Sequence, residues 1–244
     1  MYTNPVIDDN FPDPAIIRTR SGWYYAYGTQ TKRAGVVINL QVARSADLIN
    51  WEYLGEGLPE KPSWATESQK IWAPHVSEHH GRFYLYYSAR PNGADHFSLA
   101  VAVADAPAGP FLDSGQPLLA GPGFTCIDPM AFDDPATGQR LLYWGSGFGP
   151  IWVQELADDR LGFRAGSAPQ ALIHPSTSHD PRDYTGWWKR PGCTSVRAGT
   201  TFSFRATTAV GPRLTTRCSW LGPATPPAPS RRMPLPRATR TRPC

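Results

Sequence analysis

One short pattern is repeated three times along the first 146 residues, and it limits what the chain can fold into. Each copy places a proline at the start of a short strand, then a tight turn, then a second strand rich in aromatic residues that ends in a small residue. The three prolines are Pro14, Pro74 and Pro129, at spacings of 60 and 55 residues. A hairpin that recurs at this period predicts sheets arranged radially, because a single such sheet cannot bury both of its faces.

A second pair of strands is expected in each repeat. Residues 36–38 and 41–45 continue the first unit, residues 99–105 the second, and residues 151–156 the third. Helical spacing of apolar residues is absent from these segments, whereas short runs of β-branched and aromatic residues between turn residues are typical of strands. We therefore expect an all-β chain with three units of four strands each.

Charge divides the chain into two parts. Residues 1–183 hold all 20 Asp and Glu and 13 of the 24 Lys and Arg, a net charge of −7, whereas residues 184–244 hold 11 Lys and Arg and no acid. The strand pattern also stops near residue 184, and residues 224–237 are rich in Pro and Arg. Such a composition is typical of disorder. We predict a sheet domain over residues 1–183 and a disordered basic tail over residues 184–244.

Other features limit where the chain works. No apolar run approaches the roughly 20 residues of a membrane-spanning helix, and the N-terminal residues lack the pattern of a secretory leader. The four cysteines, at positions 126, 193, 218 and 244, show no paired or metal-binding spacing. We interpret them as free thiols and assign no metal and no cofactor. These features favour a cytoplasmic chain with no membrane partner, or an exported chain whose leader was removed.

Asp13 and Asp128 each stand directly before the proline of a repeat. Prolines on both sides of Asp13 exclude it from a helix and from a central ladder. Its carboxylate is therefore expected directly before the first residue of a strand, a place that we call the mouth of the strand. A single Asp before Pro is most often a turn residue that bonds its own backbone. The matching position of Asp128 two repeats later favours a shared function for the pair instead.

The second repeat has Ala73 at the matching position, preceded by Trp72. A tryptophan is more often part of a core than a surface for a ligand, and both interpretations of Trp72 stay open at this point. The histidines at 79–80 and the aspartates at 133–134 fall on expected turns. We interpret these pairs as solvated rather than as metal ligands.

Four phrases together resemble glycoside hydrolase family 43. They are Asn-Phe-Pro-Asp-Pro at residues 10–14, Ser-Ala-Asp-Leu-Ile-Asn-Trp at 45–51, Ile-Trp-Ala-Pro at 71–74 and Ile-Asp-Pro at 127–129, and the resemblance covers roughly residues 4–183. Each phrase alone is a weak signal, but four in order are a strong one. The resemblance implies a five-bladed β-propeller, of which this chain has about the first three blades.

The resemblance also implies a reaction and roles for particular residues. The family cleaves arabinose- or xylose-containing glycans, here with inversion, which needs one carboxyl group as acid and another as base, about 6.5–9.5 Å apart. It implies that Asp13 is the general base and that Asp128 orients the acid and keeps its pKa high by like-charge repulsion. Trp72 would offer an apolar face to a sugar ring, and Ser146 would line the same cavity.

The general acid implied by the resemblance is missing. In the family it is a Glu in a phrase similar to Val-Glu-Gly at the start of the fourth blade, but this chain has no Glu after Glu155. Glu155 itself lies in an expected outer strand rather than at a strand mouth. We therefore expect this chain to belong to an enzyme lineage and to be impaired in catalysis.

The genetic code offers an explanation for the missing acid. Trp187-Trp188-Lys189 is encoded only by TGG TGG AAR, which, read one nucleotide earlier than the Trp188 codon, gives GTG GAA, Val-Glu. In that frame the codons of residues 205–211 permit Gly-Asp-Asn-Cys-Cys-Gly, and those of residues 214–220 permit His-Tyr-Ala-Val-Leu-Val, both similar to fourth-blade phrases of the family. We hypothesise that the reading frame slips near residues 184–186, which would also account for the loss of every acid in the tail.

Three functions are weighed on this basis. The leading one is a glycosidase with a carbohydrate substrate, and the second is a carbohydrate-binding propeller fragment without catalysis. The third is an interaction scaffold whose basic tail contacts nucleic acid electrostatically. We predict no nucleic-acid partner, because a slipped frame explains the basic tail without one.

Overall fold

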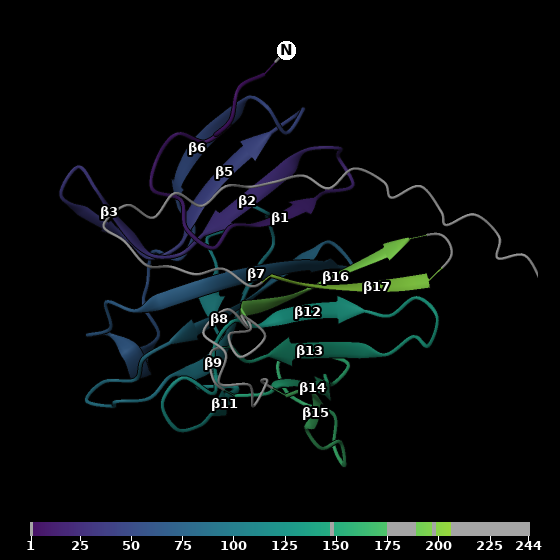
Figure 1. Cartoon of the computed structure of the whole chain (residues 1–244). Helices are drawn as coiled ribbons and strands as arrows, with labels where there is room; N and C mark the ends of the chain where they lie inside the picture. Colours follow the sequence, from purple (N-terminus) through teal and green to yellow (C-terminus); the bar gives the residue numbers. More distant parts are fainter. Residues whose placement is uncertain (1, 147–148, 175–188, 197–198, 206–244) are drawn as a thin grey trace, which may run out of the picture.

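The repeated hairpins appear as three antiparallel sheets in the computed structural model, which describes residues 2–146 and 149–174 and the backbone of 189–196 and 199–205 (Figure 1). The first sheet has the order β1-β2-β5-β6, from strands Ala15–Arg18, Tyr24–Gly28, Gln41–Ser45 and Trp51–Glu56. The second has the order β10-β9-β8-β7, from Leu112–Asp113, Ser98–Ala104, Arg82–Ala89 and Ile71–His79, with β11 (Leu119–Ala120) also paired to β9. The third is β12-β13-β14-β15, from Met130–Asp133, Arg140–Trp144, Ile151–Glu155 and Gln170–Ile173. The expected three units of four main strands are confirmed.

The first strands of the three sheets lie side by side. Strand β7 contacts β1 and β2 of the first sheet on one side and β12 of the third on the other. Each sheet then runs outward from its own first strand (β1, β7 or β12) in chain order. This arrangement is that of propeller blades around an axis, and it brings the starts of β1, β7 and β12 toward one another.

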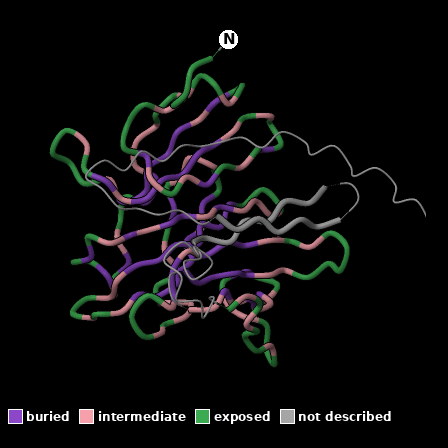
Figure 2. The backbone as a smooth tube through the Cα atoms, in the orientation of Figure 1, coloured by how far each residue is buried: buried purple, intermediate pink, exposed green. Residues whose placement is uncertain are grey.

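The second sheet is buried on both faces, which explains the composition of its central strand. Successive side chains of a strand point to opposite faces. In β8, Leu85 and Tyr87 pack with Leu40 and Val42 of the first unit. From the opposite face of β8, Tyr84 and Tyr86 pack with apolar residues of the third sheet, namely Leu142, Trp144 and Leu156. Figure 2 shows the buried positions along the interior of the sheets and the exposed ones at the turns. The unbroken aromatic and aliphatic run of β8 from Phe83 to Tyr87 is what such a double interface requires.

Two short hairpins differ from the sequence expectation. Residues 36–38 were expected to continue the first sheet, but β4 (Val36–Ile38) pairs only with β3 (Thr31–Arg33) in a small separate sheet. Ala34 and Gly35 between them both have positive φ, 45° and 87°, the geometry of a two-residue hairpin turn. That tight turn folds β4 back on β3 before it reaches the first sheet.

The second difference falls in the segment predicted to lack strands. Strands β16 (Lys189–Val196) and β17 (Gly199–Arg205) form an antiparallel hairpin, and β16 lies beside β12 and β13 (Figure 1). The physical reason is local: residues 194–204 are rich in Thr, Ser, Val and Phe, and most of these favour extended backbone although they do not alternate with polar residues. The Pro- and Arg-rich residues 224–237, predicted to be disordered, lie outside the described residues.

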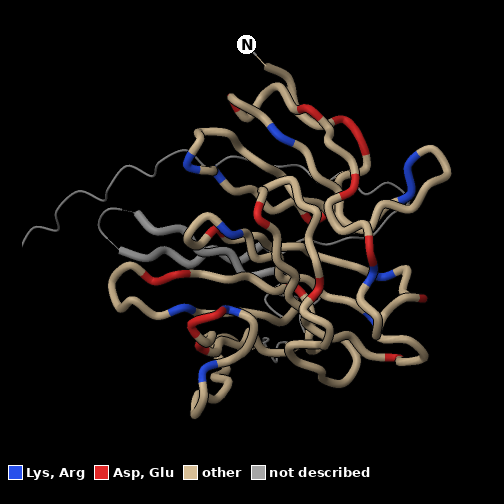
Figure 3. The backbone as a smooth tube through the Cα atoms, turned by 180° about the vertical axis from the view of Figure 1, so that it is seen from behind, with Lys and Arg blue, Asp and Glu red and all other residues tan. Residues whose placement is uncertain are grey.

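Two remaining features complete the described chain. Its helical content there is one 3-10 turn, η1 (Ser63–Ala65), so no helix of the described residues is long and apolar enough to cross a membrane. Figure 3 shows Lys and Arg positions dispersed among Asp and Glu positions over the sheets.

Candidate active site

The residue before each repeated proline has the same unusual backbone. The φ angles of Asp13, Ala73 and Asp128 are 49°, 46° and 57°. This left-handed region is uncommon for residues other than glycine and costs about 1–2 kcal/mol, and Asp is among the side chains that tolerate it best. Because a left-handed φ occurs at the same position of all three repeats, the three mouths share one backbone geometry. Backbone strain of this kind is often found at functional sites.

Asp13 is held by a buried hydroxyl. Thr29, the residue after β2, is 7% exposed and donates a hydrogen bond from Oγ1 to Oδ2 of Asp13, at 2.9 Å. The Thr29 amide donates to the carbonyl of Pro12, at 3.0 Å, which fixes the turn on the other side of Asp13. The carboxylate of this exposed residue is therefore oriented by the sheet below it rather than by its own turn alone.

The same hydroxyl joins the first sheet to the second. Thr29 Oγ1 accepts a hydrogen bond from the Ala73 amide at 2.7 Å, which satisfies a buried N–H at the second mouth. One threonine therefore positions both the Asp13 carboxylate and the backbone next to Trp72.

Asp128 is attached to the second sheet by an equivalent contact. Its amide donates to Oγ of Ser88, at 3.1 Å, and Ser88 is fully buried near the end of β8. Ser88 is also the register partner of Trp72 across the β7–β8 ladder. Hydrogen bonds and strand pairing thus connect Asp13, Trp72 and Asp128 in one continuous set of residues at the mouths of β1, β7 and β12.

The sequence analysis missed Thr29 and Ser88, although it contained a signal for them. Each repeat was seen to end its aromatic strand in a small residue, and Ser146 was singled out in the third. Ser146 is 7% exposed and follows β13 one residue after Gly145, the position that the strand registers align with Thr29 and Ser88. A small residue at this position is therefore repeated in all three units, and in the first two it is a hydroxyl residue that accepts a backbone amide of the next sheet.

Trp72 belongs to an aromatic cluster that is only partly buried. Its ring centroid lies 4.5 Å from that of Phe97 and 6.4 Å from that of Phe124, with the Phe124 plane inclined by 19°. Phe97 is 2% exposed whereas Phe124 is 56% exposed, and Lys70 Nζ lies 5.8 Å from the Trp72 centroid. Trp72 thus packs on a core residue, Phe97, and retains partial exposure beside the mouths.

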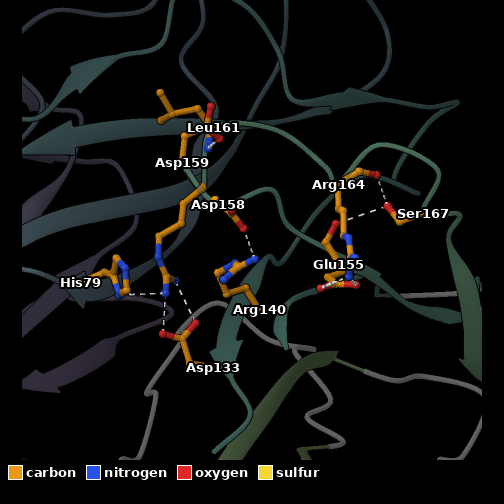
Figure 4. Close-up of polar contacts among 10 residues, drawn as sticks. His79, Asp133, Arg140, Glu155, Asp158, Asp159, Leu161, Arg164 and Ser167 are labelled. Atoms are coloured by element: carbon orange, nitrogen blue, oxygen red, sulfur yellow. Dashed lines mark hydrogen bonds and ion pairs between the residues drawn. The ribbon is translucent and has the colours of Figure 1, made fainter. Parts of the chain in front are cut away.

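The pairs interpreted as solvated make a contact that the sequence did not predict. Arg160, 1% exposed, donates hydrogen bonds to both carboxylate oxygens of Asp133, at 2.9 and 2.6 Å, and its Nη2 lies 3.1 Å from Nδ1 of His79 (Figure 4). Both His79 and Asp133 lie at the ends of strands and contact Arg160, whereas the Asp133 side chain stays 50% exposed, as the solvated interpretation expects. Asp133 is the last residue of β12 rather than the first residue of a turn. The available sequence signal for its contact was Arg160, the basic residue directly after Asp158 and Asp159.

Two hollows on the surface of the described residues lie away from the mouths, on the third sheet, with volumes of about 650 and 780 Å³. The first is lined by charged residues that pair with one another, Arg140 with Asp158 and Arg164 with Glu155 (Figure 4). Neither contains Asp13 or Asp128. We place the candidate site at the strand mouths rather than in these hollows, because the paired surface charges are already satisfied, whereas the mouths repeat one uncommon backbone geometry three times.

Within the ranges that the structure describes, no three His, Cys, Asp or Glu side chains form a group that could hold a metal ion. Cys126, two residues before Asp128, is buried, and burial raises the pKa of its thiol. A thiol whose ionised form is disfavoured in this way is a packing residue rather than a nucleophile.

The fold and the mouths define the class: a propeller-like arrangement of sheets whose inner strand ends carry carboxylates. Comparison with known proteins then gives the family. The sequence profile of glycosyl hydrolases family 43 matches residues 2–194, and the chain belongs to this family.

Particular relatives agree with this assignment. The chain is 31% identical to the probable arabinan endo-1,5-alpha-L-arabinosidase D of Emericella nidulans, over 68% of this chain and 43% of the relative. It is 32% identical to the extracellular endo-alpha-(1->5)-L-arabinanase of Thermotoga petrophila, over 59% of this chain and 35% of the relative. The crystal structure of a thermostable family-43 glycoside hydrolase superposes with a TM-score of 0.69 and 27% identity, over 85% of this chain and 68% of that one. The chain thus spans less than half the length of these two curated relatives.

Proposed function

We propose that the chain derives from a glycosidase that hydrolyses arabinose- or xylose-containing glycans with inversion, and that Asp13 is its general base. The observation that carries the proposal is the hydrogen bond from Thr29 to Asp13 at a strained strand mouth, in a network that continues through Trp72 to Asp128. Oriented carboxylates beside an aromatic face are what glycoside hydrolysis needs. The names of the relatives, which are arabinanases and xylosidases, support the same substrate class.

Asp128 takes the second role in this proposal. It would orient the general acid and keep that acid protonated by like-charge repulsion. Trp72 would carry the sugar ring on its partly exposed face, and Ser146 would line the third mouth. These roles are assigned by the resemblance and by their places in the repeat, and variants of each residue test them.

The general acid belongs at the mouth of β16 in this proposal. Strand β16 lies beside β12 as β12 lies beside β7. In the shifted reading frame, the Glu codon overlaps the codon of Lys189, the residue at which β16 begins. This coincidence supports a slip of the frame just upstream, with Lys189 standing where an acid is needed.

Activity should depend strongly on the leaving group. A general acid supplies about 10²–10⁴-fold when the leaving oxygen needs a proton. A 4-nitrophenyl leaving group departs as a stable anion and needs that proton far less. We expect the chain to release 4-nitrophenol slowly from an α-L-arabinofuranoside or a β-D-xyloside, and to leave linear arabinan almost intact.

The test compares the chain with Asp13→Asn and with a version whose gene is corrected by one nucleotide near codons 184–186. Asp13→Asn should abolish the residual release of 4-nitrophenol, and the corrected frame should raise hydrolysis of arabinan by about 10²-fold or more. Equal rates for the chain and Asp13→Asn would contradict the role of Asp13. Nucleotide sequence across codons 180–220 without the Val-Glu reading would remove the frame hypothesis.

A second candidate is carbohydrate binding without catalysis. It is favoured by one observation, the absence of any Glu after Glu155. Binding of arabino-oligosaccharides with no release of 4-nitrophenol under any condition would select it over the glycosidase. The end of the sheet domain at residue 183 is also a proposal. The family profile extends past that residue, to residue 194.

The compartment is also a proposal. We propose the cytoplasm, with export as the alternative, which the names of three relatives favour because they contain the word extracellular. Fractionation of the producing cells distinguishes the two.

A further inference from the structure

The aromatic cluster around Trp72 contains one ring that the proposed reaction does not use. Phe124 is 56% exposed, and among the described residues it is the most exposed of the large aromatic side chains of the core sheets and their loops. Its ring is nearly parallel to that of Trp72, inclined by 19°, with centroids 6.4 Å apart. Two nearly parallel aromatic faces can each pack against one of two neighbouring sugar rings.

The turn that carries Phe124 is held in place. The carbonyl of Gly123 accepts a hydrogen bond from the Phe97 amide, at 2.9 Å, and Thr125 donates from its amide and its hydroxyl to the Pro122 carbonyl, at 3.2 and 2.9 Å. Phe97 also contacts the Phe124 ring, with centroids 5.3 Å apart. An aromatic face held in advance loses little conformational entropy when a ligand binds, which favours affinity.

The place of Phe124 in the chain connects it to the mouths. It stands four residues before Asp128, and its partner Trp72 pairs with Ser88, which binds the Asp128 amide. Two neighbouring rings are too small to serve as a stable protein interface, which buries about 1,200–2,000 Å² in total. Flat aromatic faces with a few polar groups are instead typical of small-ligand sites.

Charge limits the kind of ligand. The carboxylates of Asp13 and Asp128 disfavour an acidic sugar, and the Lys70 ammonium near the Trp72 face offers a donor to neutral hydroxyls. We propose that Phe124 and Trp72 together form an extended platform for a neutral oligosaccharide of at least two units, with Phe124 carrying the outer unit. This inference rests on the proposed function, because it assumes that a glycan occupies the mouths.

The test measures binding rather than turnover, so it does not depend on the general acid. Linear α-1,5-arabino-oligosaccharides of one to five units are titrated by calorimetry into the full chain, Phe124→Ala, Phe124→Leu and Phe124→Trp. Affinity of the unaltered chain should rise with ligand length. Phe124→Ala and Phe124→Leu should lose about 2- to 10-fold at the longer ligands and little at the single sugar, whereas Phe124→Trp should keep the gain.

A control variant and a control ligand complete the design. Tyr53→Ala removes another exposed aromatic side chain, 37% exposed on β6, and should leave the titrations unchanged. Oligogalacturonate of equal length should bind more weakly than the neutral ligand. Length-dependent binding that is equal in the chain and in Phe124→Ala, or tighter binding of oligogalacturonate, would overturn the platform while leaving the proposed function intact. No binding of any arabino-oligosaccharide by the unaltered chain would overturn both.

Discussion

Strand β7 joins the second sheet to the first and to the third, and these two junctions are alike at the mouths. At each, a hydroxyl at the end of an aromatic strand accepts the amide of the residue before the next proline: Thr29 accepts that of Ala73, and Ser88 that of Asp128. The distances are 2.7 and 3.1 Å. The left-handed backbone of Ala73 and Asp128 is thus held by the same kind of hydrogen bond at both junctions.

Away from the mouths the two junctions differ. Toward the first sheet, Glu78 forms an ion pair with Arg20, whose side chain is 80% exposed, and the Gly57 carbonyl accepts the Phe111 amide at 2.8 Å. Toward the third sheet, His79 forms a hydrogen bond with the buried guanidinium of Arg160, and Asp133 forms an ion pair with the same guanidinium (Figure 4). Neighbouring residues of one strand point to opposite sides, so each serves a different junction.

The comparison separates what the architecture requires from what it leaves open. At the mouths each blade presents the same backbone to the axis, and at both junctions a small hydroxyl accepts the amide of that backbone. At the opposite strand ends the sheets do not share one geometry, so the contacts there can differ. One junction has the exposed ion pair of Arg20 and Glu78, and the other has the ion pair of Asp133 with the buried Arg160. The predictions below test this division.

The largest effect is expected from Asp133→Ala. It leaves the Arg160 guanidinium buried without its carboxylate, and breaking such a pair costs about 3–5 kcal/mol; we expect the lower end because Asp133 is half exposed. The matched change at the other junction, Arg20→Ala, should alter the free energy of unfolding by less than about 1 kcal/mol, since an exposed pair contributes little. Urea denaturation measures both. Equal losses in the two variants would contradict the distinction between the junctions.

Gly109→Ala should weaken the junction of the first and second sheets. Gly109 has a φ of 89°, and a Cβ there would stand 2.6 Å from the Gly57 carbonyl oxygen. We expect a loss of about 2–3 kcal/mol, of which the backbone conformation accounts for about 1–2. Gly22→Ala is the control, because Gly22 has a φ of 90° and no atom within 4 Å of the added Cβ. If both variants lose the same amount, close approach of the two sheets is not what limits Gly109.

Thr29→Val tests the contact that the two junctions share. The variant keeps the shape of the side chain but leaves the Ala73 amide without its acceptor and Asp13 without its donor. A buried donor left without a partner costs about 1–3 kcal/mol. Ser88→Ala should cost a similar amount, measured by the same denaturation.

Thr29→Ser, which keeps the hydroxyl, is the control for Thr29→Val. Only the Thr29 variants touch the carboxylate of Asp13, so Thr29→Val, but not Ser88→Ala, should also abolish release of 4-nitrophenol through that residue. Retention of both stability and activity in Thr29→Val would show that the threonine is not a positioning residue.

The repeated mouths could be predicted from the sequence because they depend on local chemistry. Proline and the residue before it limit the backbone at once, so Asp13 and Asp128 could be placed at strand mouths without any tertiary information. The run of aromatic residues after each turn predicted the second strand of each hairpin. The family phrases then connected these positions to a reaction.

The junctions could not be predicted, because they join residues that are far apart in the chain. Arg160 is 27 residues from Asp133 and 81 from His79, and nothing local distinguishes it from a solvated arginine in an acidic turn. Phe97 and Phe124 gave no signal for the same reason, since only the packed sheets bring their rings to Trp72. The β16–β17 hairpin was missed because its strand-forming residues lie in a segment whose overall composition indicated disorder.

The smallest effect concerns pH and the buried junction. Burial and the charge of Arg160 lower the pKa of His79, so the folded state disfavours the imidazolium more than the unfolded state does. The unfolded chain then binds more protons as the pH falls below the ordinary histidine value of about 6.5, and folding loses stability in that direction. His79→Gln keeps an acceptor for Arg160 but does not titrate. The difference in unfolding free energy between the unaltered chain and His79→Gln, measured by urea denaturation from pH 7.5 to 5.0, should therefore shift in favour of the glutamine variant at low pH. Parallel curves over this range would mean that the junction holds Arg160 through Asp133 alone.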